Sequence, residues 1–172
     1  MKAEEFYRII ACGDTMATKT NAVRLVQQAG IPCREAFYEY DEQDLSGLHA
    51  ANAVGMPAEQ VFKTLVARGE KTGIHVFCIP VCCSLDLKKA AKAAGDKNME
   101  MVSVKELLGL TGYIRGGCSP VGMKKKYPTH FDETCILWDE IAVSAGARGH
   151  QMIVPPEMLA DLVNAQIVDV IL

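Results

Sequence analysis

The sequence has few of the features that mark membrane, secreted or charge-driven nucleic-acid-binding proteins. Its 172 residues contain no run near the roughly 18 apolar residues that a membrane span needs. Seven scattered cysteines, an odd number, favour reduced thiols in a cytoplasmic protein over a disulfide framework. With 18 Lys and Arg against 21 Asp and Glu, bulk charge alone does not bind nucleic acid. We expect no membrane partner and no DNA.

Common catalytic and metal motifs are also missing. Cys78, Cys82 and Cys83 lie close together, but no second Cys/His pair stands at zinc spacing. The four histidines are dispersed without an H-E-x-x-H pattern, and there is no G-x-S-x-G elbow. Five Phe, five Tyr and one Trp are too few for an extended base-stacking platform. We therefore expect no metal, no organic cofactor and no nucleophile–base pair of the usual kind.

The chain has the length and composition of one domain. Hydrophobic residues make up 49% and charged residues 23%, as in ordinary globular proteins, and no repeat or linker divides the sequence. The acidic first residues are not followed by an apolar run, which argues against a secretory signal. Since residues 16–21 resemble a second start, we expect a peripheral lead-in over residues 1–15 and a single domain over residues 16–172.

Hydrophobic periodicity predicts short helices between short strands. We expect Asn21 to cap the first helix, Gly109 to end the fourth, and Pro155 and Pro156 to open the last. The predicted helices cover residues 21–29, 48–54, 85–94, 103–109 and the segment after Pro156. The predicted strands cover residues 33–40, 61–67, 74–79, 99–102, 134–138, 141–145, 150–154 and 167–171. Without regular β-α-β alternation, this order favours a mixed sheet or barrel of the α/β or α+β class.

Charge is unevenly distributed along the chain. Between Lys88 and Lys126 lie nine basic residues and only three acids, whereas one basic residue and seven acids follow from Tyr127 onward. If the central segment folds onto one face, that face can meet a phosphate chain. A solvated lysine-rich surface is the alternative.

Lys63 is the first candidate for chemistry. By strand alternation it shares a face with the apolar residues Val61 and Leu65, while Thr64 points to the other face. Burying an ammonium costs several kcal/mol unless an anion compensates, which favours a functional role. The alternative is a lysine at a strand end whose ammonium reaches water.

Two glycine-rich segments are the other candidates. Residues 115–122 (RGGCSPVG) precede three lysines, and their paired glycines let the backbone approach an anion closely. An NTP-binding loop is excluded, because Met123 stands where that motif has lysine. In the second segment Arg148 lies between Gly146 and Gly149, where it can contact a phosphate or carbonyl, or simply pair with an acid.

Five motifs together resemble the YbaK family of free-standing editing proteins, the cysteinyl-tRNA(Pro) deacylases, which are related to the insertion domain of bacterial prolyl-tRNA synthetase. These motifs occur in order over most of the chain: residues 61–66 (VFKTLV), 85–90 (LDLKKA), 112–113 (GY), 116–122 (GGCSPVG) and 146–149 (GARG). The resemblance implies a mixed, barrel-like β-sheet surrounded by helices. It also implies a pocket for the aminoacylated 3′ end of tRNA.

The resemblance assigns roles to particular residues. The essential lysine of the family corresponds to Lys63, its neighbour to Thr64 and the pocket tyrosine to Tyr38. The glycine-rich loop corresponds to Gly116, Gly117, Ser119 and Gly122. Two departures bear on amino-acid specificity: Gln151 stands where cysteine-specific members often have aspartate, and Cys82 and Cys83 replace small residues.

The function implied is trans-editing, the removal of a mischarged amino acid, foremost cysteine, from tRNA(Pro). In similar proteins the substrate's own thiol attacks its ester and leaves as a cyclic thiolactone, so no protein nucleophile is needed. Partners would be aminoacylated tRNA and prolyl-tRNA synthetase, in the cytoplasm. The alternatives are an alanyl-tRNA deacylase of the same fold, a non-catalytic module that binds tRNA ends or nucleotides, and a small-molecule hydrolase.

Overall fold

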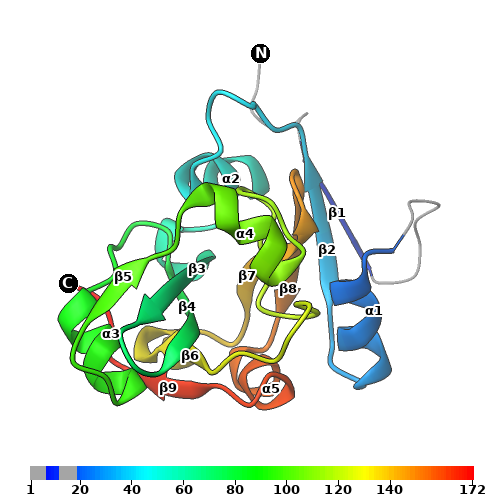
Figure 1. The fold of residues 1–172 in the computed structure, drawn as a ribbon. Helices are drawn as coiled ribbons and strands as arrows, with labels where there is room; N and C mark the ends of the chain where they lie inside the picture. The colour runs from blue at the N-terminus through cyan, green and yellow to red at the C-terminus, as the bar shows by residue number, and fades with distance from the viewer. Residues whose placement is uncertain (1–6, 12–18) are drawn as a thin grey trace.

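The computed structural model describes the backbone of residues 7–11 and all of residues 19–172, and its strands form two sheets (Figure 1). The four-stranded sheet has the order β1-β2-β8-β7, and the five-stranded sheet the order β5-β3-β4-β6-β9. The strands are β1 (Tyr7–Ala11), β2 (Arg34–Tyr38), β3 (Phe62–Gly69), β4 (Gly73–Pro80), β5 (Met99–Met101), β6 (Thr129–Asp132), β7 (Ile141–Ala147), β8 (His150–Val154) and β9 (Gln166–Val168).

Among residues 7–11 and 19–172, five α-helices and two short 3₁₀ helices connect and cover these sheets. In Figure 1, α2 lies at the top, α4 in front, and α3 and α5 along the lower side. The α-helices are α1 (Asn21–Gln28), α2 (Gly47–Val54), α3 (Leu87–Ala94), α4 (Val104–Thr111) and α5 (Pro156–Leu162). The 3₁₀ helices are η2 (Ala58–Gln60) and η3 (Glu133–Leu137).

The predicted mixed α+β class is confirmed, but the nine strands that the structure describes form two sheets and do not close into one. Parallel pairs join β4 to β6 and β6 to β9, while the other strand pairs are antiparallel. Just before β3, Val61 forms a parallel bridge with Ala142 of β7, which links the two sheets. The barrel-like arrangement is therefore two sheets that meet beside the start of β3.

The core fills the space between the sheets and the helices. Its largest fully buried side chains include Phe62, Phe77 and Phe131, which come from β3, β4 and β6. Fully burying side chains of this size contributes roughly 1.5–3 kcal/mol each. Because the buried Phe62 directly precedes Lys63, the start of β3 is anchored in the core beside that lysine.

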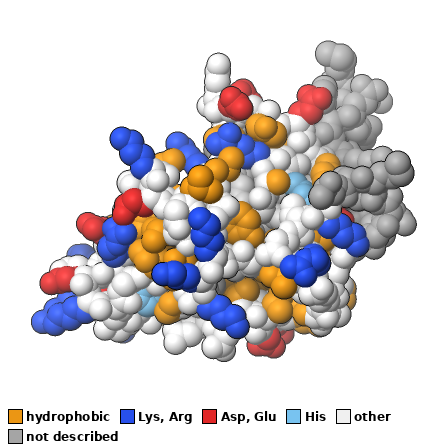
Figure 2. Space-filling model, turned by 45° about the vertical axis from the view of Figure 1, so that its right-hand side comes forward, with side chains coloured by type: hydrophobic (Ala, Val, Ile, Leu, Met, Phe, Trp, Pro, Cys, Tyr) orange, Lys and Arg blue, Asp and Glu red, His pale blue; other side chains and the backbone are white. Residues whose placement is uncertain are grey.

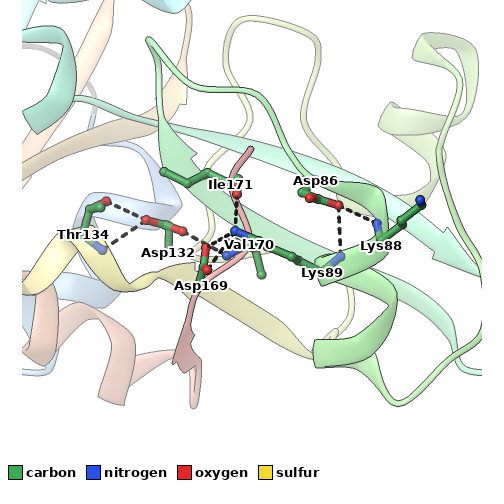
Figure 3. A network of polar contacts seen from close by, with 8 residues as sticks. All are labelled: Asp86, Lys88, Lys89, Asp132, Thr134, Asp169, Val170 and Ile171. Carbon is green, nitrogen blue, oxygen red and sulfur yellow. Dashed lines mark hydrogen bonds and ion pairs between the residues drawn. The ribbon is translucent and has the colours of Figure 1, made fainter.

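A polar network ties the C-terminal segment to the sheet (Figure 3). Asp132, at the end of β6, accepts hydrogen bonds from Thr134 and from the Val170 backbone nitrogen. Lys89 Nζ contacts both Asp169 carboxylate oxygens at 2.8 and 2.9 Å and donates to the Ile171 carbonyl. This lysine of the basic segment is therefore engaged with the protein's own C-terminal residues.

Three predicted details are wrong. Residues 134–138 belong largely to η3, because Asp132 caps this turn, and the strand is the preceding β6, whose four residues are all buried. The fourth helix continues through Gly109 and ends at Gly112, which has the left-handed φ of 84°. The first helix is capped by the Thr20 side chain, which accepts from the Val23 nitrogen, rather than by Asn21.

Part of the predicted lead-in over residues 1–15 falls within the described range. Residues 7–11 form β1, the edge strand of the four-stranded sheet, paired with β2. The remaining lead-in residues lie outside the described residues. Within the described ranges, no helix has the length and apolar content to cross a membrane.

Candidate functional site

A pocket of about 430 Å³ opens between β3, α2, α4 and the turn that joins β7 to β8. All residues from Val61 to Val66 contribute to its wall, so β3 forms one side. Six of the nine residues expected at the site line it: Tyr38, Lys63, Thr64, Gly116, Arg148 and Gln151. The fold therefore brings together segments that lie far apart in the sequence.

Lys63 lies near the beginning of β3, where it is half-buried in the pocket wall. Burial lowers the pKa of its ammonium, whereas the nearby thiols of Cys83 and Cys82 act in the opposite direction. The strand neighbours of Lys63 are held by pairing with β4, in which Lys63 lies opposite Ile79. A partly desolvated cation in a fixed position is suited to an anionic or polarised oxygen of a ligand.

Thr64 and Cys118 line the same pocket but offer no activated nucleophile. The Thr64 hydroxyl lies 3.7 Å from Cys78 Sγ, on the opposite side of the strand from Lys63. Burial raises the pKa of Cys118 to about 12, so this thiol stays protonated at neutral pH. The pocket chemistry therefore depends on cations, hydrogen bonds and the substrate's own groups.

The glycine-rich loop and the β7–β8 turn meet through Arg148. Its Nε donates to the backbone carbonyl of Arg115 at 2.9 Å. Gly116 follows with a φ of 86°, and a Cβ added there would lie 3.5 Å from Arg148 Cγ. This contact fixes a second cation in the pocket wall beside a backbone that only glycine adopts easily.

Tyr38 and Gln151 form a polar pair on neighbouring strands. Burial raises the pKa of Tyr38, and the nearby Gln151 side chain acts in the opposite direction with a smaller effect. Gln151 Oε1 is buried and has no hydrogen-bond partner among the described residues. Because a buried acceptor without a partner is costly, this oxygen is suited to receive a donor from a bound molecule.

The other three expected residues lie elsewhere in the glycine-rich loop. Gly117 packs so tightly that a Cβ would lie 3.2 Å from the Arg148 backbone nitrogen. Ser119 is fully buried and accepts from the Val121 nitrogen, and Gly122, with a φ of 78°, packs against Asn21 and Tyr113. These residues shape the loop that carries Gly116, and a direct role for them in binding stays a prediction.

Sequence reasoning missed the α2 side of the pocket, where Asp44, Ser46 and His49 lie. The Ser46 hydroxyl caps α2 by accepting from the His49 backbone nitrogen. His49 Nδ1 lies 3.9 Å from an Asp44 carboxylate oxygen, and Nε2 lies 3.4 Å from the Glu39 carbonyl. Since neither ring nitrogen bonds a hydroxyl, this is not a Ser-His-Asp triad. Only the capping serine had a sequence signal.

Surface charge and potential metal ligands are two further properties that bear on what the described residues can bind. On the face shown in Figure 2, Lys and Arg side chains predominate in the middle, between hydrophobic patches, and acidic side chains lie toward the outline. Such a surface is suited to a polyanion. In the described part of the chain, no group of three or more His, Cys, Asp or Glu residues is arranged to hold a metal ion.

Comparison with known proteins adds the deciding observation: the family model of the aminoacyl-tRNA editing domain matches residues 47–162. This chain belongs to the aminoacyl-tRNA editing domain family. The matched range contains Lys63, the glycine-rich loop, Arg148 and Gln151. Five residues of the pocket lining precede this range: Tyr38, Tyr40, Asp44, Leu45 and Ser46.

Relatives extend the similarity over most of the chain. EbsC of Enterococcus faecalis, proposed by its name to be a Cys-tRNA(Pro)/Cys-tRNA(Cys) deacylase, is 46% identical over 152 residues. That match covers 88% of this chain and 93% of EbsC. YwhH of Bacillus subtilis, an uncharacterized protein, is 24% identical over 72% of this chain and 78% of its own length.

Solved structures share the fold. A proposed trans-editing enzyme for prolyl-tRNA synthetase superposes with a TM-score of 0.74 at 28% identity, over 90% of this chain and 99% of that chain. A hypothetical protein superposes with a TM-score of 0.78 at 21% identity, over 87% and 97% of the two chains. The second likeness concerns the fold alone.

Proposed function

We propose that the protein is an aminoacyl-tRNA deacylase that acts in trans and removes a mischarged amino acid, foremost cysteine, from tRNA(Pro). The observation that carries this proposal is the placement of Lys63 and Arg148 in one pocket, beside the glycine backbone at Gly116, in a chain of the editing family. EbsC, whose name gives the same activity, supports the choice of cysteine and tRNA(Pro).

The pocket residues have complementary roles in this proposal. Lys63 places its ammonium against the ester carbonyl or the phosphate of the terminal nucleotide, where it stabilises developing negative charge. Arg148 and the Gly116 backbone N–H hold the nucleotide portion through charge-assisted hydrogen bonds. Tyr38 and Gln151 contact the aminoacyl group, with Gln151 Oε1 as the acceptor for one of its donors.

The reaction needs no nucleophile from the protein. The substrate's cysteinyl sulfur attacks its own ester carbonyl, the bond from that carbonyl to the ribose oxygen breaks, and the thiol proton ends on that oxygen. The products are a cyclic thiolactone and deacylated tRNA. The enzyme contributes orientation and charge, which suffices because an aminoacyl ester is already activated. Were the amino acid alanine, a water held in the pocket would attack instead.

The wider setting is part of the same proposal. Residues 16–172 constitute one editing domain, of which the family match covers the middle and most of the C-terminal part. Prolyl-tRNA synthetase, which produces mischarged tRNA(Pro), is the proposed protein partner, and the cytoplasm, where tRNA is charged, is the proposed location. The basic side chains of Figure 2 are suited to the acceptor stem of the tRNA.

A side-by-side deacylation assay tests the proposal. Cysteinyl-, alanyl- and prolyl-tRNA(Pro) are incubated with the protein, and the remaining ester is measured over time. We expect rapid loss of the cysteinyl ester and little loss of the prolyl ester. Preferential loss of the alanyl ester would reassign the amino acid. Binding of all three without turnover would identify a non-catalytic module, and binding insensitive to salt would contradict a tRNA ligand.

A further inference from the structure

Two adjacent thiols lie beside the pocket and have no part in the proposed reaction. Cys82 and Cys83 follow β4, and their Sγ atoms are 3.8 Å apart, in van der Waals contact. Cys82 is exposed and Cys83 is half-buried. The pair is therefore open to small reagents and already holds both sulfurs on the same side of the turn.

The turn that carries these thiols contacts the pocket wall through hydrogen bonds and packing. The Cys83 backbone nitrogen donates to the Pro80 carbonyl at 3.0 Å and closes the turn. Between them, Val81 donates to the Val61 carbonyl at 2.8 Å and lines the pocket. Val81 also packs tightly on α2, since a Cβ added at Gly47 would lie 2.3 Å from Val81 Cγ1. Val81 therefore connects the turn to β3 and α2 on either side of the pocket wall.

The thiols also share an electrostatic environment with Lys63. Burial raises the pKa of the Cys83 thiol, and the Lys63 ammonium acts against this shift. In return, both thiols act to raise the pKa of Lys63. The net pKa of Cys83 is raised, so Cys83 serves as the second thiol that closes the disulfide, and the exposed Cys82 is the thiol that meets the oxidant.

We propose that Cys82 and Cys83 form a reversible dithiol–disulfide site whose oxidation reshapes the pocket wall at Val81 and reduces turnover at Lys63. The effect on turnover rests on the proposed deacylase function, whereas the disulfide and its effect on the pocket do not. The oxidant class is a hydroperoxide.

The step balances with a hydroperoxide as the two-electron oxidant. The thiolate of the exposed Cys82 attacks one peroxide oxygen, the O–O bond breaks, and a sulfenic acid and hydroxide form. The Cys83 sulfur then attacks the Cys82 sulfur and displaces a second hydroxide. The two hydroxides take up the two thiol protons, so the products from hydrogen peroxide are the disulfide and two waters.

Covalent geometry makes a disulfide between Cys82 and Cys83 easy to reduce, as suits a regulatory bond rather than a structural one. Consecutive Cα atoms are about 3.8 Å apart, below the roughly 4.4–6.8 Å of ordinary disulfides. A bond between neighbouring cysteines is therefore strained, and strained, exposed disulfides are readily reduced. A cellular thiol reductant would restore the pair.

Intact and peptide mass spectrometry after treatment with hydrogen peroxide tests the proposal. We expect loss of two hydrogens from the peptide that contains both cysteines, a severalfold drop in deacylation of Cys-tRNA(Pro), and recovery with dithiothreitol. Acetylation of Lys63 by acetic anhydride, also read by mass, reports the pocket without requiring activity, and its rate should change severalfold on oxidation.

Matched variants separate this site from the other cysteines. Cys82→Ser and Cys83→Ser should each abolish the peroxide effect, whereas Cys33→Ser and Cys12→Ser, the latter outside the described residues, should retain it. A peptide that stays dithiol, oxidation of Cys82 alone, or a disulfide that leaves Lys63 acetylation unchanged would overturn the proposal. If the reduced protein deacylates nothing, the proposed function fails, while the mass and acetylation readouts still decide this inference.

Discussion

Arg148 and Arg115 meet through a hydrogen bond between the side chain of one and the backbone of the other. Arg148 Nε donates to the Arg115 carbonyl at 2.9 Å, although the two residues lie 33 positions apart in the chain. This bond uses one of the five N–H donors of the guanidinium. It therefore joins the glycine-rich loop to the β7–β8 turn and holds a fixed cation at the pocket, which Gly116 and Gly149 also line.

Removal of this cation should weaken tRNA binding more than it slows chemistry. For Arg148→Ala we expect KM to rise about tenfold, because a charge-assisted hydrogen bond contributes roughly 1.5–3 kcal/mol. The slope of log affinity against log salt should fall by about 1. Arg148→Lys keeps the charge without the forked geometry, so its KM should lie between those of the wild type and Arg148→Ala. Binding of Cys-tRNA(Pro) at a series of salt concentrations measures these slopes. Equal slopes for the wild type and Arg148→Ala would contradict a phosphate contact by Arg148.

Gly149 should be indispensable for the shape of the pocket. Its φ is 73°, and an added Cβ would lie 2.5 Å from the Tyr38 carbonyl oxygen. Gly149→Ala should lower the free energy of unfolding by at least about 2 kcal/mol, since the left-handed conformation alone costs about 1–2 kcal/mol. The matched control is Gly30→Ala, where φ is 72° and nothing lies within 4 Å of the added Cβ. Urea unfolding of both variants separates the two effects, since Gly149→Ala combines a steric clash with an unfavourable φ, whereas Gly30→Ala has the unfavourable φ alone. Equal losses of stability would contradict this account.

A chain of hydrogen bonds runs from a surface carboxylate to two buried histidines. Asp96 accepts from the Thr72 hydroxyl at 2.8 Å, so His75 Nε2, also 2.8 Å from that hydroxyl, must donate to it. His75 Nδ1 is then left to accept from His130 Nε2, 3.1 Å away. These three hydrogen bonds all form when both imidazoles are neutral, and His130 Nδ1 is then a buried acceptor without a hydrogen bond to the described residues.

This chain predicts a loss of stability in mild acid. Burial and the neighbouring His75 lower the pKa of His130 to about 4, and burial also lowers that of His75. Because the folded pKa lies below the unfolded value near 6.5, the stabilisation is complete above pH 6.5 and is lost as the pH falls toward 4. For His130 the loss between pH 7 and pH 5 is about 2 kcal/mol.

Urea unfolding at pH 7 and pH 5 measures this loss. His130→Gln removes the titrating group, so the variant should lose about 2 kcal/mol less than the wild type between these two pH values. The carboxyl of Glu106, with a pKa lowered to about 2 by Arg68 and Ser103, stays ionised throughout the interval. A variant that loses stability as steeply as the wild type would show that another group is responsible.

The Cys118 thiol should be dispensable for catalysis. It is protonated at neutral pH and packs in the core, so Cys118→Ala should keep kcat/KM of deacylation within about threefold while costing on the order of 1 kcal/mol of stability. Alkylation by iodoacetamide should be much slower at Cys118 than at the exposed Cys82. Loss of activity in a folded Cys118→Ala protein would point to a covalent intermediate.

Sequence patterns predicted the elements whose ends carry local signals. The Ser103–Glu106 capping box and the β-rich run of residues 61–67 each gave the right element, because caps and β-forming side chains act locally. By contrast, β6 is four residues long and mostly polar (THFD), and it is buried only because β4 and β9 flank it. No local pattern reports such a tertiary effect.

The residues of the candidate site also fall into two groups, those with a local sequence signal and those that only the fold brings together. Lys63 and Arg148 were found because a lysine in an apolar strand and an arginine between glycines are unusual on their own. His49 and Asp44 were missed, since their approach depends on the loop before α2 rather than on a recognised spacing. Gly116 lines the pocket, whereas Gly117, Ser119 and Gly122 do not. The sequence alone could not distinguish them, because it does not show which side of the glycine-rich loop faces the pocket.

Single-turnover deacylation of Cys-tRNA(Pro) by Lys63→Ala tests the central role of Lys63 most directly. Lys71→Ala is the matched control, because Lys71 is an exposed lysine in the turn between β3 and β4, away from the pocket lining. We predict that Lys63→Ala slows the step by about 10²–10³-fold, the usual cost of removing a group that stabilises developing charge, with stability preserved. Lys71→Ala should match the wild type. An undiminished rate in Lys63→Ala would contradict the account.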